Sequence, residues 1–152
     1  MLSNEIVKIA RRVICDILEG AAFVFTDELY DEIPLESWAA QGVKIEFEGS
    51  TNGEIHMWAP PEFLSICAAN MLGIEETDGA ALKGRVDAGK EILNMVAGLF
   101  ITESYGDETV FHLSIPEELK KNSLLEEMES ADSLWIQAEG QALLFLFKVE
   151  NV

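Results

Sequence analysis

Residues 43–58 carry the pattern that most restricts how this chain can fold. Apolar and polar side chains alternate through residues 43–48 and again through 54–58, and Asn52-Gly53 lies between the two runs. A period of two gives each strand one apolar face, and Asn-Gly is typical of tight hairpin turns. The segment therefore predicts an antiparallel β-hairpin that buries one of its faces.

Segments with helical and β-strand patterns surround this hairpin. Apolar residues recur every three or four positions in three predicted helices, which cover residues 4–19, 61–72 and 80–102. Pro60-Pro61 suits the start of the second helix and Gly73 its end, because proline lacks an N–H and glycine readily adopts a left-handed conformation. Further strands are predicted at 23–25, 109–115, 134–138 and 142–149, and a short helix or helical loop at 117–129.

The order of these elements predicts an α+β fold in which helices pack on a largely antiparallel β-sheet. Residues 16–19 and 91–94 have similar sequences within two of the predicted helices, which suggests two weakly related halves. The 152 residues are 49% hydrophobic, and no low-complexity linker divides them. We therefore expect a single domain that spans residues 1–152.

The composition is strongly acidic, with 28 aspartate and glutamate residues against 10 lysine and arginine residues and a formal net charge of -18. This charge repels nucleic acids and anionic membrane surfaces, so neither is an expected partner. Residues 1–5 lack the basic and apolar regions of a secretory signal, which points to the cytoplasm. Cys15 and Cys67 occupy apolar positions of helical patterns and are expected to be reduced thiols.

The third predicted helix has a polar face formed by Asp87, Glu91 and Asn94. With about 100° of rotation per residue, Asp87 lies at about -40° and Asn94 at about -60° when Glu91 defines the origin. Apolar residues occupy most of the other side, so this face can point outward while the helix packs on the core. Gly84 and Gly98 lie at the two ends of the polar face, where the lack of a side chain permits close approach of a partner.

The residue types on this face suit recognition of a charged partner. The carboxamide of Asn94 offers both a donor and an acceptor and can orient a water molecule, while the carboxylate of Glu91 can pair with a cation. Asparagine has poor propensity for a helix interior, so a function of its side chain is one explanation of its presence. The other explanation is a solvated stripe on an amphipathic helix, which is the commoner case.

The segment 87–98, together with Pro116, resembles the signature of the CheC, CheX and FliY phosphatases. That signature has an aspartate or serine, three further residues, a glutamate, two further residues, an asparagine, and a proline about 22 residues later. Asp87, Glu91 and Asn94 match these positions, and 21 residues separate Asn94 from Pro116. The preceding sequence is similar to the CheX branch at Phe47, Gly53, Glu54-Ile55, Pro60-Pro61 and 68–73.

This resemblance implies a CheC-like fold and a reaction, the hydrolysis of the aspartyl phosphate of a CheY-like receiver domain. It implies that Asn94 positions the hydrolytic water and that Glu91 docks onto the active-site lysine of the receiver. Asp87, Gly84 and Gly98 are expected to support docking. Because the receiver itself supplies the Mg²⁺ that neutralises the developing charge, no metal or other cofactor is expected in this chain. The phosphorylated receiver is the expected partner.

Two other features bear on metals and partners. His56 and His112 lie in predicted strands, without the cysteine or histidine spacing that makes a zinc site. Residues 142–147 are apolar on both faces, so the last strand is either central in the sheet or paired with another chain. Because the similar CheX proteins are dimers joined through sheet structure, a homodimer is expected.

Residue types alone leave other functions open. A non-catalytic module that binds a receiver or associates with the flagellar switch would keep the same helix for recognition. A small-molecule-binding domain unrelated to signalling would carry the motif spacing only by chance. The resemblance to CheX implies one active helix per chain, since Glu19 of the first helix stands where the water-orienting amide is needed.

Overall fold

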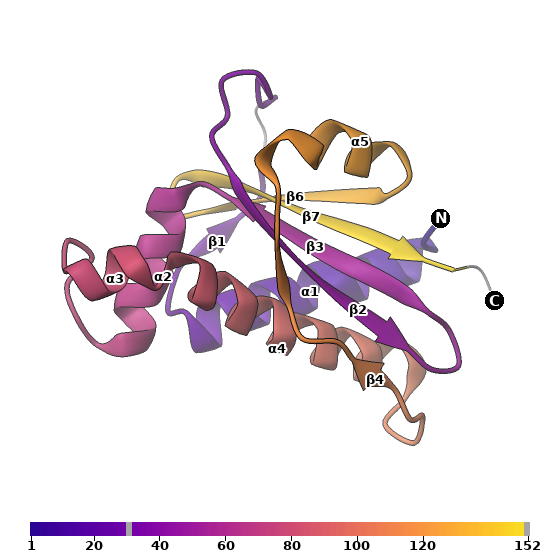
Figure 1. Cartoon of the computed structure of the whole chain (residues 1–152). Helices are drawn as coiled ribbons and strands as arrows, with labels where there is room; N and C mark the ends of the chain where they lie inside the picture. The colour runs from indigo at the N-terminus through magenta and orange to yellow at the C-terminus, as the bar shows by residue number, and fades with distance from the viewer. Residues whose placement is uncertain (30–31, 151–152) are drawn as a thin grey trace.

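An antiparallel β-sheet with helices packed on both of its faces forms the centre of the molecule (Figure 1). The computed structural model describes residues 1–29 and 32–150. The helices are α1 (Asn4–Ala21), α2 (Pro61–Leu72), α3 (Gly79–Lys83), α4 (Arg85–Tyr105), α5 (Leu124–Glu129) and the 3-10 helix η1 (Lys121–Ser123). The strands are β1 (Thr26–Asp27), β2 (Gln41–Glu48), β3 (Gly53–Ala59), β4 (His112–Leu113), β5 (Glu117–Leu119), β6 (Asp132–Ala138) and β7 (Gln141–Val149). This arrangement confirms the predicted α+β class.

The sheet has the strand order β1-β6-β7-β3-β2-β4, and every neighbouring pair is antiparallel. β2 and β3 form the predicted hairpin, in which Val43 pairs with Met57 and Ile45 with Ile55. β5 also pairs with β2, so β4 and β5 follow one another along the same edge. Residues 112–119 therefore form an interrupted edge strand.

The last strand, β7, lies inside the sheet between β3 and β6. Its apolar residues 142–147 are buried, so they present no exposed apolar edge to solvent. This position removes the need for a second chain to cover the strand. The homodimer therefore stays a prediction that rests on the family resemblance alone.

The two faces of the sheet bury different clusters of side chains. On one face, α1, α2 and α4 contribute Ile14, Phe63 and Phe100 to a large core that also contains alternate side chains of the strands. On the other face, Trp58 belongs to a smaller cluster, against which Met128 of α5 packs. Figure 1 shows α4 and α5 on opposite sides of the sheet. The alternation of side chains along each strand is what gives the sheet two buried faces.

The chain after α1 departs from the predicted strand at 23–25. The N–H groups of Ala22 and Val24 both donate to the carbonyl of Leu18, at 3.2 and 3.3 Å, and so close the end of the helix. Phe23 adopts a left-handed conformation with a φ of 57°, and the strand forms only at Thr26–Asp27. Residues 23–25 were predicted as a strand from their β propensity, but the turn that ends α1 includes Phe23 and Val24.

The predicted helix of residues 80–102 is divided at Gly84. The N–H of Ala80 donates to the carboxylate of Asp78 at 2.9 Å, which caps α3. The N–H of Gly84 donates to the carbonyl of Ala80 at 2.9 Å, and α4 begins at the next residue. The low helix propensity of glycine explains why the break occurs there.

The segment after α4 differs most from the prediction. Of the predicted strand 109–115, only His112–Leu113 is a strand, and residues 117–119 pair with β2 instead of starting a helix. The predicted short helix is confirmed further along, as η1 and α5. Short edge strands depend on the backbone of their partner more than on their own sequence.

Candidate functional site

The three polar residues predicted to share one face of α4 are exposed on that helix. Asp87, Glu91 and Asn94 are open to solvent, whereas Ile92 and Phe100 are among the residues that the helix buries. Asp87 lies in the first turn, where a carboxylate interacts favourably with the free N–H groups of the helix. The amphipathic pattern therefore holds α4 against the sheet and presents the polar face outward.

A groove lies between α4 and the chain that connects β4 to β5. Its volume is about 420 Å³, and it is lined by Asp87, Lys90, Glu91, Asn94, Ser114, Ile115 and Pro116. The helix contributes the charged and amide groups, and the connecting chain contributes an apolar side chain and a proline. The fold thus brings Pro116 into the same groove as Asn94, although 21 residues separate them.

Hydrogen bonds to β2 hold the connecting chain in place. The N–H of Ser114 donates to the carbonyl of Glu46 at 2.8 Å, and the N–H of Glu46 donates to the Ser114 hydroxyl at 2.9 Å. Pro116 has no N–H to pair, which suits the interruption of an edge strand. Ile115, between these two residues, is 87% exposed. An exposed isoleucine is therefore held at a defined position beside the polar face of α4.

Two carboxylates and one ammonium group line the groove. None of the ion pairs within residues 1–29 and 32–150 includes Asp87, Lys90 or Glu91. Both carboxylates are exposed and Lys90 is half-buried, so these charges are available to a partner. A partner that presents a cation beside acidic groups would complement this arrangement.

A comparison with protein families identifies the chain. The family model described as chemotaxis phosphatase CheX matches residues 42–139, which include β2 except its first residue, all of β3 and α4, and the chain that completes the groove. The chain belongs to this family. A comparison with curated protein sequences gives no significant match.

Solved structures of CheX, CheC-like and FliY proteins have the same fold. A chain of the CheX-CheY-BeF3-Mg complex from Borrelia burgdorferi has a TM-score of 0.70 at 18% identity, covering 95% of this chain and 97% of that one. A CheC-like protein from Shewanella has a TM-score of 0.67 at 13% identity, covering 99% and 100%. FliY from Thermotoga maritima has a TM-score of 0.55 at 14% identity, covering 93% and 85%. These similarities confirm the expected CheC-like fold.

The two glycines predicted to flank the polar face have different surroundings in this CheX-family chain. Gly84 precedes α4 and does not line the groove; a Cβ there would lie 3.0 Å from the carbonyl oxygen of Ala80 and 3.6 Å from the Cβ of Ala68. Its lack of a side chain therefore serves packing within the chain. Gly98 lies one turn beyond Asn94, and a Cβ there would meet nothing within 4 Å. Gly98 does not line the groove either, but it leaves open surface next to the amide.

The first helix carries an exposed pair at the positions that correspond to Glu91 and Asn94, but no carboxamide. Its corresponding residues are Asp16 and Glu19, both carboxylates. Asp16 lies 4.0 Å from a guanidinium nitrogen of Arg12, and Glu19 accepts a hydrogen bond from the Thr26 hydroxyl at 2.5 Å. Both side chains are exposed, as Glu91 is, so the difference from α4 is the carboxylate that stands in place of the Asn94 carboxamide.

Sequence reasoning did not single out Lys90, Ser114 or Ile115, although all three line the groove. Lys90 falls between two positions of the signature and carries no pattern of its own. Ser114 and Ile115 directly precede Pro116, and that neighbourhood is the one signal that could have placed them at the site.

A second group of polar side chains lies on the face of the sheet that α5 covers. Glu54 and Glu127 each contribute a carboxylate oxygen, and His56 contributes a ring nitrogen, and these three atoms all lie within 4.8 Å of one another. Burial lowers the pKa of His56, an effect that the nearby carboxylates of Glu54 and Glu127 oppose. The cysteine and histidine spacings that identify zinc sites in a sequence could not reveal this group, because Glu127 lies on a helix distant in sequence from Glu54 and His56. The absence of a metal from this chain stays a prediction.

The hydrophobicity of the helices bears on the expectation that a membrane is not a partner of this chain. Among the described residues, no helix combines the length and the apolar character that crossing a membrane requires.

Proposed function

We propose that this chain accelerates hydrolysis of the aspartyl phosphate of a CheY-like receiver domain. The observation that carries the proposal is the groove between α4 and residues 114–116, where exposed Glu91 and Asn94 share one helix face. Membership of the chemotaxis phosphatase CheX family supports this class of reaction. The similar structure from Borrelia burgdorferi is a complex of CheX with CheY, BeF3 and Mg²⁺, which supports the choice of partner.

Asn94 is assigned the positioning of the attacking water. Its carboxamide can accept a hydrogen bond from the water while its N–H donates to a neighbouring oxygen. The water oxygen forms a bond to phosphorus as the bond between phosphorus and the aspartyl oxygen breaks, and a water proton passes to the phosphate. The products are inorganic phosphate and the free aspartate carboxylate. Orientation supplies the acceleration, since the chain provides no nucleophile.

Glu91 is assigned the docking of the receiver. An exposed carboxylate can form a charge-assisted hydrogen bond with the active-site lysine of the receiver, and this contact would fix the distance between Asn94 and the phosphorus. Asp87 and Gly98 on α4, with Gly84 at its N-terminal cap, are assigned the support of docking. Mg²⁺ belongs to the receiver and neutralises charge on the phosphoryl group.

The decay of a phosphorylated receiver tests this proposal. Receivers from the same organism are phosphorylated with a small phosphodonor and Mg²⁺, and the loss of phosphate is timed with and without the chain. The native chain should accelerate decay, and Asn94→Ala should reduce the acceleration about 100-fold or more because the water is no longer oriented. Asn122→Ala is the matched control, since Asn122 is also exposed and does not line the groove.

Two outcomes would contradict parts of the proposal. A chain that binds the phosphorylated receiver but leaves its decay at the intrinsic rate would be a receiver-binding adaptor, not a phosphatase. An Asn94→Ala variant as active as the native chain would remove Asn94 from the mechanism and leave the activity to other groups. Thermal unfolding of each variant shows whether a loss of activity reflects a loss of fold.

The organisation of the chain follows from the same proposal. Receiver domains of this kind act in the cytoplasm, so we place this chain there. Residues 1–152 would act as a single domain with one active helix, because the α1 counterparts of Glu91 and Asn94 are Asp16 and Glu19.

A further inference from the structure

The face of the sheet that carries α5 holds a compact group of four ionisable side chains. Glu54 and His56 project from β3, Lys148 from β7, and Glu127 from α5. His56 Nε2 lies 3.2 Å from Glu54 Oε1, and His56 Nδ1 lies 3.6 Å from Glu127 Oε2. The imidazole is therefore placed between two carboxylates that come from different layers of the fold.

His56 is the unusual member of this group. It is completely buried, and neither ring nitrogen has a hydrogen-bond partner among the residues that the structure describes. Buried polar atoms are normally paired, so a completely buried imidazole whose nitrogens face carboxylates at 3.2 and 3.6 Å without the geometry of a hydrogen bond requires an explanation. A neutral imidazole has one N–H and one lone pair, so it can donate to only one of the two carboxylates. A ligand that accepts the lone pair and also binds the carboxylates would satisfy all three groups.

Lys148 is the cation that now contacts both carboxylates. Its ammonium contacts Glu127 Oε2 and lies 3.5 Å from Glu54 Oε1. Lys44 lies opposite His56 in the register of β2 and β3. Its ammonium group pairs with Glu46 at 3.3 Å, so it is not the cation that occupies the space between Glu54 and Glu127. The principal competitor of an added cation is therefore the ammonium of Lys148.

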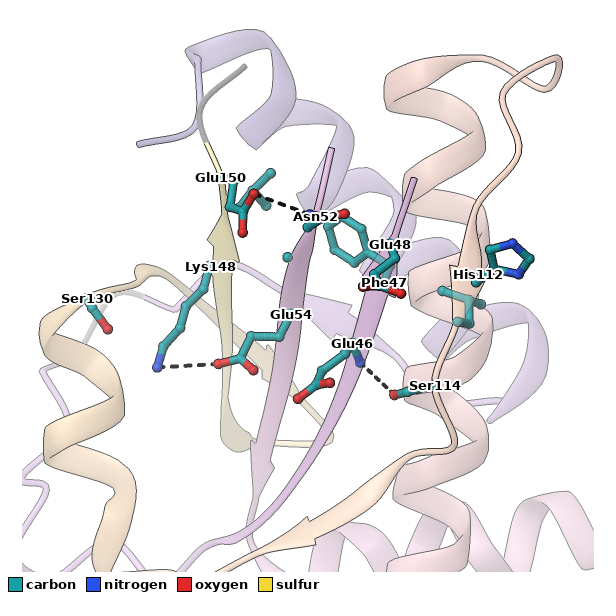
Figure 2. A pocket seen from close by; sticks show the side chains of 13 residues that line it. Glu46, Phe47, Glu48, Asn52, Glu54, His112, Ser114, Ser130, Lys148 and Glu150 are labelled. Atoms are coloured by element: carbon teal, nitrogen blue, oxygen red, sulfur yellow. Dashed lines mark hydrogen bonds and ion pairs between the residues drawn. The ribbon is translucent and has the colours of Figure 1, made fainter. Parts of the chain in front are cut away.

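An open depression on the sheet exposes Glu54 and Lys148 to solvent, whereas His56 is buried behind them and Glu127 does not line the depression. The depression has a volume of about 690 Å³, and both Glu54 and Lys148 line it, as Figure 2 shows with their ion pair. The side chains of Glu54, Lys148 and Glu127 are 24%, 22% and 24% exposed. An ion would reach His56 once the flexible stem of Lys148 turns toward the acidic rim of the depression, where Glu46 and Glu150 lie.

We propose that Glu54, His56 and Glu127 form a binding site for a divalent transition-metal ion, with Lys148 displaced when the ion binds. One imidazole nitrogen and two carboxylates are ligands that Zn²⁺ accepts, and water would complete the coordination. Mg²⁺ prefers oxygen ligands to an imidazole nitrogen, so the Mg²⁺ of a receiver assay would not fill the site. The ion would join α5 to β3, because its ligands come from both.

Zn²⁺ titration by calorimetry tests the proposal on the full chain after treatment with a chelator. The native chain should bind one Zn²⁺, and Co²⁺ in its place should give visible absorption bands typical of nitrogen and oxygen ligands. His56→Gln should abolish this binding. His112→Gln is the matched control, because the other histidine of the chain is exposed and lies outside the group. Lys148→Met should tighten binding about tenfold or more, since a competing charge is removed.

The outcomes are separable from those of the phosphatase proposal because the measurement uses the metal alone, without a receiver. The absence of stoichiometric binding in both the native chain and Lys148→Met would overturn the site and leave an ion-pair group only. Equal loss of binding in His112→Gln and His56→Gln would also overturn it. Circular dichroism of the metal-free His56→Gln variant checks its fold, and Glu127→Gln, on a partly exposed helix, gives a second ligand variant.

Discussion

Glu91 and Asn94 lie less than one helical turn apart on α4, yet their side chains suit different steps. A carboxylate can pair with a cation but cannot donate a hydrogen bond. A carboxamide can both donate a hydrogen bond to a water molecule and accept one from it. Both residues are exposed, so neither is required by the core. Their separate contributions should therefore appear in kinetics and not in stability.

Replacement of Glu91 by glutamine should weaken docking without removing the chemistry. Glu91→Gln keeps the shape of the side chain but removes the charge that pairs with the receiver's lysine, which should raise the Kd for the phosphorylated receiver about tenfold. The decay rate at saturating enzyme should change much less. A receiver titration followed by single-turnover decay separates the two quantities, and an unchanged Kd would contradict the docking role.

Cys67 on α2 provides a pH-dependent prediction at the residue scale. Burial, with a smaller contribution from Glu139, raises the pKa of the Cys67 thiol from 9.0 to about 12. The folded pKa lies above the unfolded one, so the contribution to stability is complete below pH 9 and is lost as the pH rises toward about 12. The free energy of unfolding should therefore fall across this range.

The comparison of native chain and Cys67→Ala isolates that contribution. The variant loses about 1 kcal/mol of packing at every pH, but its stability should decline less steeply above pH 9 than that of the native chain. Urea unfolding at several pH values between 8 and 11 gives both slopes. Parallel slopes would show that other groups account for the alkaline loss.

At the scale of elements, local sequence predicted the structure where side-chain periodicity is long. The hairpin of β2 and β3 follows from the alternating runs at 43–48 and 54–58, and the helices α1, α2 and α4 follow from apolar repeats over twelve or more residues. Predictions of short segments were wrong where a contact distant in sequence or a helix end decided the backbone conformation. Phe23 closes α1 in place of starting a strand, and β4 and β5 exist because β2 offers them an edge. Pairing at a distance is invisible to local propensity.

The candidate site divides along the same line. Asp87, Glu91 and Asn94 belong to one helix, so the helical repeat alone placed them on a common face. Ser114 and Ile115 reach the groove only because the edge of β2 positions them. The position of Pro116 in the signature is the one spacing that points to this contact.

Ser114 tests the importance of this edge. Ser114→Ala removes the acceptor for the N–H of Glu46, a bond of 2.9 Å, while the backbone bond from Ser114 to Glu46 remains. We expect a loss of about 1 kcal/mol in stability and weaker binding of the receiver, since Ile115 and Pro116 would be held less firmly. Chemical unfolding and receiver titration measure the two effects. Ser133→Ala, at an exposed position of β6 outside the groove, is the control.

At the scale of the whole molecule, charge is the property that conflicts with the proposed partner. The net charge is -18, and the active site of a receiver is acidic. Long-range attraction therefore cannot bring the two proteins together. Recognition has to depend on short-range contacts, for which the groove offers Glu91, Lys90 and the exposed Ile115.

Salt should consequently strengthen binding of the receiver. Raising the ionic strength from about 0.01 M to about 0.1 M shortens the Debye length from about 30 Å to about 10 Å, which screens repulsion between the two surfaces more than the close pairing of Glu91. The Kd should fall over this range. Glu75→Gln with Glu76→Gln changes the charge from -18 to -16 at exposed positions outside the groove, and this variant should bind more tightly at low salt but like the native chain at high salt. A Kd that rises steadily with salt in both proteins would mean that local attraction in the groove outweighs the repulsion of the whole chain.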